Sequence, residues 1–332
     1  MEAHEKERKS LVVVKYLKEN SRTCQDFVRT NFLSRRFESQ KLKKAFEWYF
    51  SYWNDFVHPG FFSLTYEAMG GQVEEMLKPQ AALAMIAAAL DIHDDIIDDS
   101  ERKHNHKTVF GKFGLDLCLL LGNAFLVNGF ALLGDFAIQL PDEDGKRIFQ
   151  IEKSCLFEVG TAHVAEFEAR SKFNFFPEKY LKILEMKAAS VEADMQIAAI
   201  AAGASQDRVK IAKEYGRIIG SLTTLREEFV DAFEPEELNR RINKEVLPIP
   251  FMYALKSLEE RKQIIKLLEK KRITKRDTDG LPSIVLESEP VVRLKEYMRD
   301  LSRRGVELSS KMSTGKSRTL LSYLAQSMLE DL

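Results

Sequence analysis

Apolar residues recur at intervals of three and four along most of the chain, and the alternation typical of strands is rare. This spacing places apolar side chains on one face of a helix and therefore predicts an all-α fold. Glycine and proline divide the pattern into segments, most clearly at Pro59-Gly60, Gly70-Gly71 and residues 141–145. The predicted helices span residues 8–33, 35–57, 61–69, 79–102, 114–138, 143–170, 177–203, 207–233, 251–270, 289–312 and 315–330. Residues 103–113 are predicted as a polar loop or helix extension, and 272–286 as a loop.

The segments show no internal repeat and no low-complexity tract. We therefore expect one α domain over residues 1–332, a helical bundle around a central cavity, with its core at about 48–255 and closing helices at 289–330. A chain of 332 residues with 45% hydrophobic content can bury such a core. The longest uncharged run, Leu117 to Gly134, contains Gly122, Asn123, Asn128 and Gly129 in its interior. We expect it to form a buried core helix rather than a membrane span.

Charge and cysteine content narrow the choice of partners and compartment. Fifty basic and 51 acidic side chains give a net charge of −1, which provides no global field to attract nucleic acid or an anionic membrane. The three cysteines are scattered without a paired spacing, so we expect a reducing, cytoplasmic location. Residues 1–10 are charged and lack an apolar segment, so no secretory signal is expected.

The most informative chemistry is the run His-Asp-Asp-Ile-Ile-Asp-Asp at residues 93–99, directly after an alanine-rich apolar stretch. On a helix, Asp94 and Asp98 lie on one face and Asp95 lies about 100° around it. Crowded carboxylates repel each other, and a solvated acidic face is the alternative explanation. Because the flanking residues 83–90 are apolar, we favour a cation site. Mg²⁺ suits such a site, since it is usually coordinated by one or two carboxylates together with water and substrate phosphates.

The segment Asp94-Asp95-Ile96-Ile97-Asp98 resembles the first aspartate-rich motif of the trans-isoprenyl diphosphate synthases, and the resemblance covers roughly Trp48 to Leu255. It implies an all-helical enzyme that uses Mg²⁺ to ionise an allylic prenyl diphosphate and joins the carbocation to isopentenyl diphosphate. Asp94, Asp95 and Asp98 would then be catalytic metal ligands.

A second acidic window, Glu227-Glu228-Phe229-Val230-Asp231, resembles the family's second aspartate-rich motif in an eroded form. The resemblance implies that Glu227, Glu228 and Asp231 bind metal, and that Thr224, at a position usually taken by glutamine, contacts substrate. An ordinary helix face with pairing between residues four apart is the alternative.

Cationic residues near both motifs match the family's diphosphate contacts in part. Arg102, Lys103 and His104 stand at or beside its Arg-Arg pair. Lys187 resembles a Lys-Thr pair that has lost its threonine, and it is expected to contact phosphate during catalysis. A solvated surface lysine is the alternative.

Two further positions concern the acceptor and the prenyl tail. The family's Gly-Lys-Arg-x-Arg-Pro segment, which grips isopentenyl diphosphate, matches residues 54–59, where its lysine and both arginines are missing. His58 is expected near this acceptor site. Ala89, five residues before Asp94, stands where aromatic side chains block the cavity floor in resembling enzymes. A deep pocket for a tail of 20 or more carbons is one interpretation, and close helix approach is the other.

Three hypotheses for function follow from these residues. The leading one is polyprenyl diphosphate synthesis with altered isopentenyl diphosphate contacts. The second is a terpene cyclase-like enzyme that ionises one prenyl diphosphate without that acceptor. The third is a non-catalytic partner subunit of a competent synthase. The resemblance implies a dimer, either with itself or with another prenyl synthase, and lipidic tails leave peripheral membrane contact as an expectation.

Overall fold

The computed structural model describes residues 8–72, 75–103, 106–170, 176–270, 273–278, 281–330 and 332. The described chain is almost entirely helical, which confirms the all-α prediction. Its helices are α1 Lys9–Leu33, α2 Gln40–Tyr52, α3 Val57–Ala68, α4 Leu77–Ile97, α5 Val109–Phe113, α6 Leu115–Ala137, α7 Asp142–Ala169, α8 Pro177–Lys187, α9 Ala189–Ala201, α10 Gln206–Asp231, α11 Pro235–Lys244, α12 Ile249–Ala254, α13 Leu258–Leu268, α14 Lys275–Thr278, α15 Leu281–Leu286, α16 Glu289–Met312 and α17 Gly315–Ser327.

Several predicted boundaries were wrong, mostly at prolines. Pro59-Gly60 was predicted to break the chain but lies in the first turn of α3, where a backbone N–H without an intrahelical partner is normal. Pro250 likewise lies in the first turn of α12. The predicted helix at 177–203 is divided at residue 188 into α8 and α9, and 251–270 is divided into α12 and α13. Helix α11 was not predicted, and the expected loop at 272–286 contains α14 and α15.

The acidic end of α4 differs from the prediction in a way that shapes the site. The helix ends at Ile97 rather than near residue 102, and Asp99 adopts a left-handed conformation with φ 51°. A short antiparallel hairpin follows, in which β1, Arg102–Lys103, pairs with β2, His106–Lys107. The hairpin folds the chain back, so that Lys103 lies beside the acidic residues of α4.

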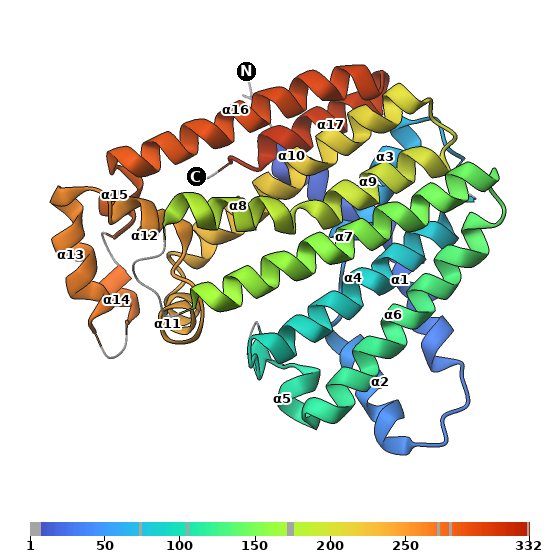
Figure 1. Ribbon diagram of the computed structural model, residues 1–332, viewed down its shortest axis with the longest axis horizontal. Coiled ribbons are helices and arrows are strands. Elements are labelled where there is room, and N and C mark those ends of the chain that lie inside the picture. Colours follow the sequence, from blue (N-terminus) through green and yellow to red (C-terminus); the bar gives the residue numbers. More distant parts are fainter. Residues whose placement is uncertain are drawn as a thin grey trace, which may run out of the picture.

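Helix α4 lies at the centre of the bundle, which explains its alanine-rich sequence. It packs against α6, α3 and α1, while α9 packs against α10, and α16 and α17 lie over α10 and α1 (Figure 1). Alanines at 81, 82, 84, 88 and 89 are buried. A Cβ at Gly129 of α6 would lie 2.9 Å from the Ala82 carbonyl oxygen, so the glycine is needed for the close approach of α6 to α4.

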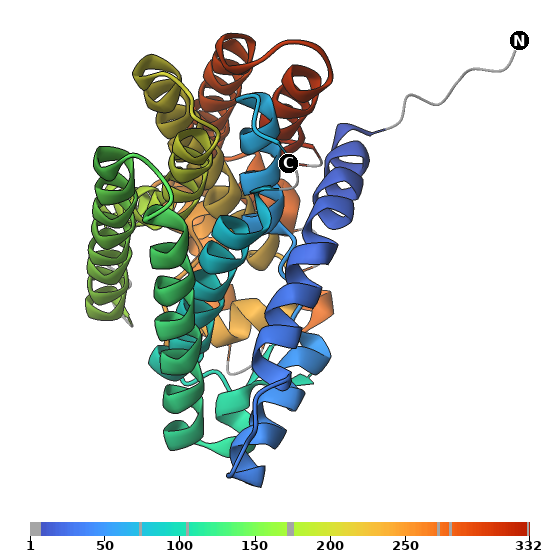
Figure 2. The same ribbon diagram turned by 90° about the vertical axis from the view of Figure 1, so that its right-hand side faces the viewer.

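Helix α6 is only partly the core helix that we expected. One face packs against α4, but the opposite face exposes Leu119, Leu120 and Val127. In the part of the chain that the structure describes, α6 is the one helix whose length and composition would suffice to cross a membrane. Helices α6 and α7, in green, run along the left-hand side of the molecule in Figure 2.

Candidate active site

A cavity of about 700 Å³ lies between α4 and α10, with α7, α8 and α11 at its sides. Its lining is rich in charged side chains of both signs. The acidic residues are Asp91, Asp94, Asp98, Glu166, Glu227, Glu228, Asp231, Glu237 and Glu245, and the basic ones are Lys103, Arg170, Lys187, Arg226, Arg240 and Arg241. The structure therefore brings both predicted acidic motifs and Lys187 to one cavity.

The α4 wall presents Asp94 and Asp98, as predicted for residues four apart on a helix. Asp95 is 4% exposed and is absent from the lining, since it points behind this wall toward Lys103. The Lys103 ammonium lies 2.8 Å from Asp95 and 3.0 Å from Asp91, so one cation bridges two turns of the helix. Asp95 is accordingly placed to hold Lys103 rather than to face the cavity.

Asp98 ends α4 and forms an ion pair with Arg170, at the end of α7. Burial and the neighbouring charges of Asp94 and Glu245 nevertheless raise the pKa of Asp98 to about 7. The Nδ1 atom of His163 lies 3.3 Å from Asp94. Burial and the like charges of neighbouring acids thus outweigh the effect of Arg170 on Asp98.

The acidic residues of the second motif lie in two different surroundings on α10. Glu227 is exposed to the cavity, whose enclosure, together with the charges of Asp231 and Glu228, raises its pKa to about 7. Enclosure also raises the pKa of Asp231 to about 6, although Arg241 lies 3.2 Å away. These two carboxylates are the α10 groups that a cation in the cavity can reach.

Glu228 is buried and already fully engaged. Its Oε1 atom accepts hydrogen bonds from the Tyr180 hydroxyl at 3.1 Å and from Arg241 at 2.7 Å, and its Oε2 atom accepts one from the Ile249 N–H at 2.9 Å. This network joins α8, α10, α11 and the start of α12. The geometry assigns Glu228 to positioning the wall rather than to the metal role that its sequence position suggested.

Lys187 lies in the cavity lining and forms an ion pair with Glu166 of α7. Burial alone would lower the pKa of Lys187, but Glu166 outweighs this effect and raises the pKa, so the side chain is cationic. It is therefore not the solvated lysine of the alternative interpretation. Thr224 also lines the cavity, although its hydroxyl donates to the Gly220 carbonyl of its own helix at 2.9 Å.

The donor set fits a hard divalent cation bound together with an anion. Nine carboxylates face six cationic side chains, so a free diphosphate would meet a net negative cavity. Carboxylate oxygens are the ligands that Mg²⁺ prefers, and it usually completes its shell with phosphate and water. Within the described ranges, no three acids or histidines converge on one point. Asp94, Asp98, Glu227 and Asp231 are the residues that could hold such ions once a phosphate supplies the remaining ligands.

A second cavity of about 550 Å³ adjoins the first. The residues that line both are Asp91, Lys103, Lys187, Thr223, Thr224 and Glu227. Its other lining residues are Tyr52, Trp53, Asn54, Asp55, Val57, His58, Ala87, Ala88, His106, Ala188, Ser190, Val191 and Gly220. His58 lines this second cavity, and its role toward an acceptor stays a prediction.

Other predicted residues lie elsewhere. Ala89 is fully buried in a core cluster with residues of α2 and α6 and lines neither cavity, so the close-approach alternative describes it better than the deep pocket. Arg102 lies in β1 opposite Lys107, outside both linings. His104 falls outside the described residues.

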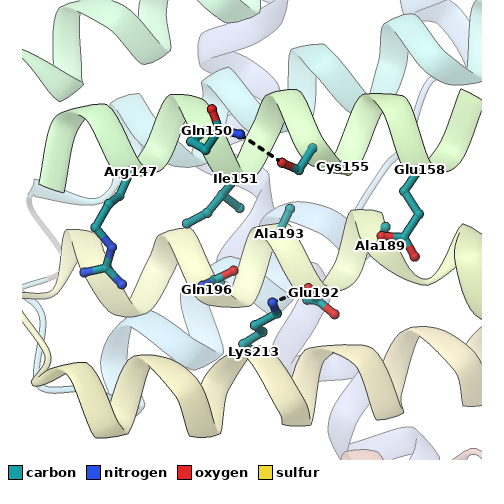
Figure 3. A pocket seen from close by; sticks show the side chains of 11 residues that line it. Arg147, Gln150, Ile151, Cys155, Glu158, Ala189, Glu192, Ala193, Gln196 and Lys213 are labelled. Atoms are coloured by element: carbon teal, nitrogen blue, oxygen red, sulfur yellow. Dashed lines mark hydrogen bonds and ion pairs between the residues drawn. The ribbon is translucent and has the colours of Figure 1, made fainter. Parts of the chain in front are cut away.

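A third hollow, between α7, α9 and α10, contains none of the predicted site residues (Figure 3). Lys213 lies 3.6 Å from Glu192 there, and Arg217 joins the same carboxylate to Glu158. These ion pairs link the three helices, and this structural role explains the charged side chains of the hollow without a ligand.

Sequence reasoning missed several residues of the first cavity. Asp91 could have been predicted from the sequence, because it precedes Asp94 and Asp95 by three and four positions and so lies on the same side of the helix. Arg170, Arg241 and Glu166 could not have been, since they come from helices far along the chain that only the fold brings together.

Comparisons with known proteins identify the family and the fold. The sequence profile of the polyprenyl synthetase family matches residues 40–284. The geranylgeranyl diphosphate synthase of Sulfolobus acidocaldarius is 24% identical over 238 residues, which cover 69% of this chain and 72% of that protein. Geranylgeranyl pyrophosphate synthetase from Pyrococcus horikoshii superimposes with a TM-score of 0.82 at 19% identity, over 98% of this chain and all of that one. A polyprenyl synthase from Caulobacter crescentus, solved with calcium and isoprenyl diphosphate, gives a TM-score of 0.79 at 15% identity, over 95% of this chain and 97% of that one.

Proposed function

The chain belongs to the polyprenyl synthetase family and is a prenyltransferase of isoprenoid biosynthesis, and on this premise we propose that it ionises an allylic prenyl diphosphate bound with Mg²⁺ between α4 and α10. One observation carries the proposal: the acidic walls of α4 and α10 face a single cavity whose sides also hold cationic groups. The relatives reported above are named as prenyl synthases, which supports prenyl transfer over the cyclase and partner-subunit hypotheses.

In this proposal, Asp94 and Asp98 of α4 and Glu227 and Asp231 of α10 hold Mg²⁺ ions. The bound ions supply positive charge that stabilises the leaving diphosphate as its carbon–oxygen bond breaks. The raised pKa values of Asp98, Glu227 and Asp231 support this assignment, because carboxylates that are buried and also crowded by other acids gain most from a nearby cation.

The cationic side chains of the cavity hold the diphosphate oxygens in the same scheme. Arg170 pairs with Asp98 and would be free to turn toward an incoming phosphate once a metal ion takes over this carboxylate. Lys187 pairs with Glu166, which is not among the proposed metal ligands, and its ammonium would bind the phosphate from beside this acid. Asp95 and Glu228 position the walls, by holding Lys103 and Arg241 respectively.

We also propose that two copies of the chain associate through the outer faces of α6 and α7. These faces expose Leu120 and Val127 of α6 and Phe157, Val164 and Phe167 of α7, and residues 117–134 carry no charge. A two-fold contact would cover the same residues in both copies. Contact with a different prenyl synthase or with a membrane surface is the competing outcome.

Cys24, Cys118 and Cys155 are free and buried, so we propose a reducing, cytoplasmic location.

The activity is tested by incubating the purified protein with Mg²⁺ and geranylgeranyl diphosphate, with and without isopentenyl diphosphate, and measuring diphosphate release. We expect release to require Mg²⁺ and to stop on chelation by EDTA. Glu227→Gln should slow it about 100-fold, the typical effect of losing one group that stabilises transition-state charge. Glu236→Gln, an exposed acid of α11 outside the lining, should change the rate less than twofold. Metal-independent release, or equal rates in the two variants, would contradict the proposal.

A further inference from the structure

The second cavity adjoins the first where the acceptor of a prenyl group must lie, because the two share Lys103, Lys187 and Glu227. Much of its wall is aromatic or apolar, with Tyr52 and Trp53 at the end of α2, and Ala87 and Ala88 of α4. This lining suits a molecule with an apolar body. What the charged part of the wall can accept depends on His58.

The His58 side chain forms an ion pair with a carboxylate that neutralises its positive charge. Its Nδ1 atom lies 2.6 Å from Oδ2 of Asp194, on α9, and Asp194 is 4% exposed. Burial alone would lower the pKa of His58, but Asp194, at hydrogen-bond distance, and the nearby acids Asp55 and Glu152 together raise it to about 10, so the 2.6 Å contact is an ion pair of an imidazolium and a carboxylate. The group around His58 therefore carries no surplus positive charge.

The position of His58 is fixed by its neighbours along the chain. Oδ1 of Asp55 accepts the N–H groups of Val57 at 2.9 Å and His58 at 3.2 Å, which caps the start of α3. Gln25 of α1 donates to the Asp55 carbonyl at 2.7 Å. The imidazole is thus presented to the cavity by a capped, anchored turn.

The other cations of the second cavity are also engaged. Lys103 pairs with Asp91 and Asp95, and Lys187 pairs with Glu166, while both line the first cavity, where the donor diphosphate is proposed to bind. The described lining contains no arginine. A second diphosphate here would bring several negative charges to a wall that also holds Asp55 and Glu227, and an anion buried without partners is strongly disfavoured.

We propose that the acceptor held in the second cavity has an uncharged head, and that the His58–Asp194 pair is the specificity determinant that excludes a second diphosphate. This rests on the proposed function for the donor alone. The donor's carbon–oxygen bond breaks and releases diphosphate. The π electrons of an acceptor alkene form the new carbon–carbon bond, and a proton leaves the neighbouring acceptor carbon for the released diphosphate.

Two probes that share one alkene test the charge preference: isopentenyl diphosphate and isopentenyl alcohol. Their affinities are measured by calorimetry in the presence of Mg²⁺ and an unreactive allylic thiodiphosphate, which occupies the donor site. We expect the wild-type protein to bind the diphosphate no more than about threefold tighter than the alcohol. His58→Arg combined with Asp194→Asn supplies an unpaired cation, and it should raise this ratio at least tenfold.

Glu192→Gln is the matched control, because it removes one negative charge from the same helix, on the side that faces the third hollow. It should leave the ratio unchanged. A wild-type preference for isopentenyl diphosphate of 100-fold would overturn the inference, whether or not the double variant folds. A folded double variant with an unchanged ratio would overturn it as well. Failure of the thiodiphosphate itself to bind would instead contradict the proposed donor site.

Discussion

At the scale of single residues, Asp98 and Asp99 are adjacent and chemically identical but lie in different surroundings. Asp98 lines the first cavity beside Arg170, whereas Asp99 pairs with Lys244 at 2.8 Å and is 65% exposed. The difference arises because Asp98 is the C-cap residue of α4, whereas Asp99 lies beyond the helix and adopts a left-handed conformation. Sequence alone predicted the motif but left the role of Asp99 undecided.

The two positions give a matched pair of substitutions. Asp98→Asn should reduce the rate of diphosphate release about 100-fold or more and weaken the dependence on Mg²⁺, since it removes a proposed ligand. Asp99→Asn should change it less than twofold, because asparagine tolerates a positive φ and the surface pair contributes little. Steady-state assays across a range of Mg²⁺ concentrations would measure both, and equal losses would argue against the assignment.

Glu227 and Glu228 make a second contrast, this time between activity and stability. Glu228→Gln leaves Arg241, whose side chain is 7% exposed, without its nearest carboxylate. We expect a loss of about 3 kcal/mol in the free energy of unfolding, the cost typical of breaking a buried pair. Urea denaturation measures it. Glu227→Gln should stay within about 1 kcal/mol of the wild type, so similar losses in both variants would show that the two roles are not separate.

At the scale of elements, His58, Asp194 and Glu152 join α3, α9 and α7 in a buried polar cluster. Burial, and then Asp194, raise the pKa of Glu152 from 4.5 to about 8. Because the folded value exceeds the unfolded one, Glu152 favours the folded state fully below about pH 4.5 and progressively less as the pH rises to about 8.

Glu152→Gln imitates the protonated acid, so its stability relative to the wild type should rise between pH 5 and pH 9. A gain on the order of a few kcal/mol corresponds to a shift of this size. Urea denaturation at both pH values measures it, and the exposed Glu168→Gln on the same helix is the control. Deprotonation of His58 at high pH lowers the stability of the wild type and of both variants alike. The difference in stability between Glu152→Gln and the wild type therefore reports on Glu152. A pH-independent difference would rule out the raised pKa.

The elements also show what sequence reasoning can reach. Long helices such as α1, α6, α7 and α16 were predicted within a few residues, because apolar periodicity over several turns is a local signal. The short helices after α10 were predicted less well. Helices α11, α14 and α15 were missed, and α12 was predicted to begin after Pro250 because Pro248 and Pro250 were interpreted as breaks, although helices tolerate proline in their first turn. Asp94, Asp98 and Lys187 were identified from local motifs. Their partners Arg170 and Glu166 depend on tertiary packing, which no local pattern records.

At the scale of the whole molecule, the outer faces of α6 and α7 expose large apolar side chains that no other described part of the chain covers. Leu120 is 57% exposed and Val127 is 66% exposed, and a separation of seven residues places both on one side of α6. Exposed apolar helix faces of this kind usually mark interfaces.

We therefore expect the protein to sediment at about twice its chain mass of 38.1 kDa. Leu120→Glu combined with Val127→Glu should yield monomers, because two charges would be buried in the contact. Leu258→Glu is the control, since Leu258 is 84% exposed but lies on α13, outside this face. A monomeric wild type, or a double variant that remains dimeric, would remove the proposed interface. A monomer that binds lipid vesicles only when Leu120 and Val127 are intact would assign the same face to a membrane surface instead.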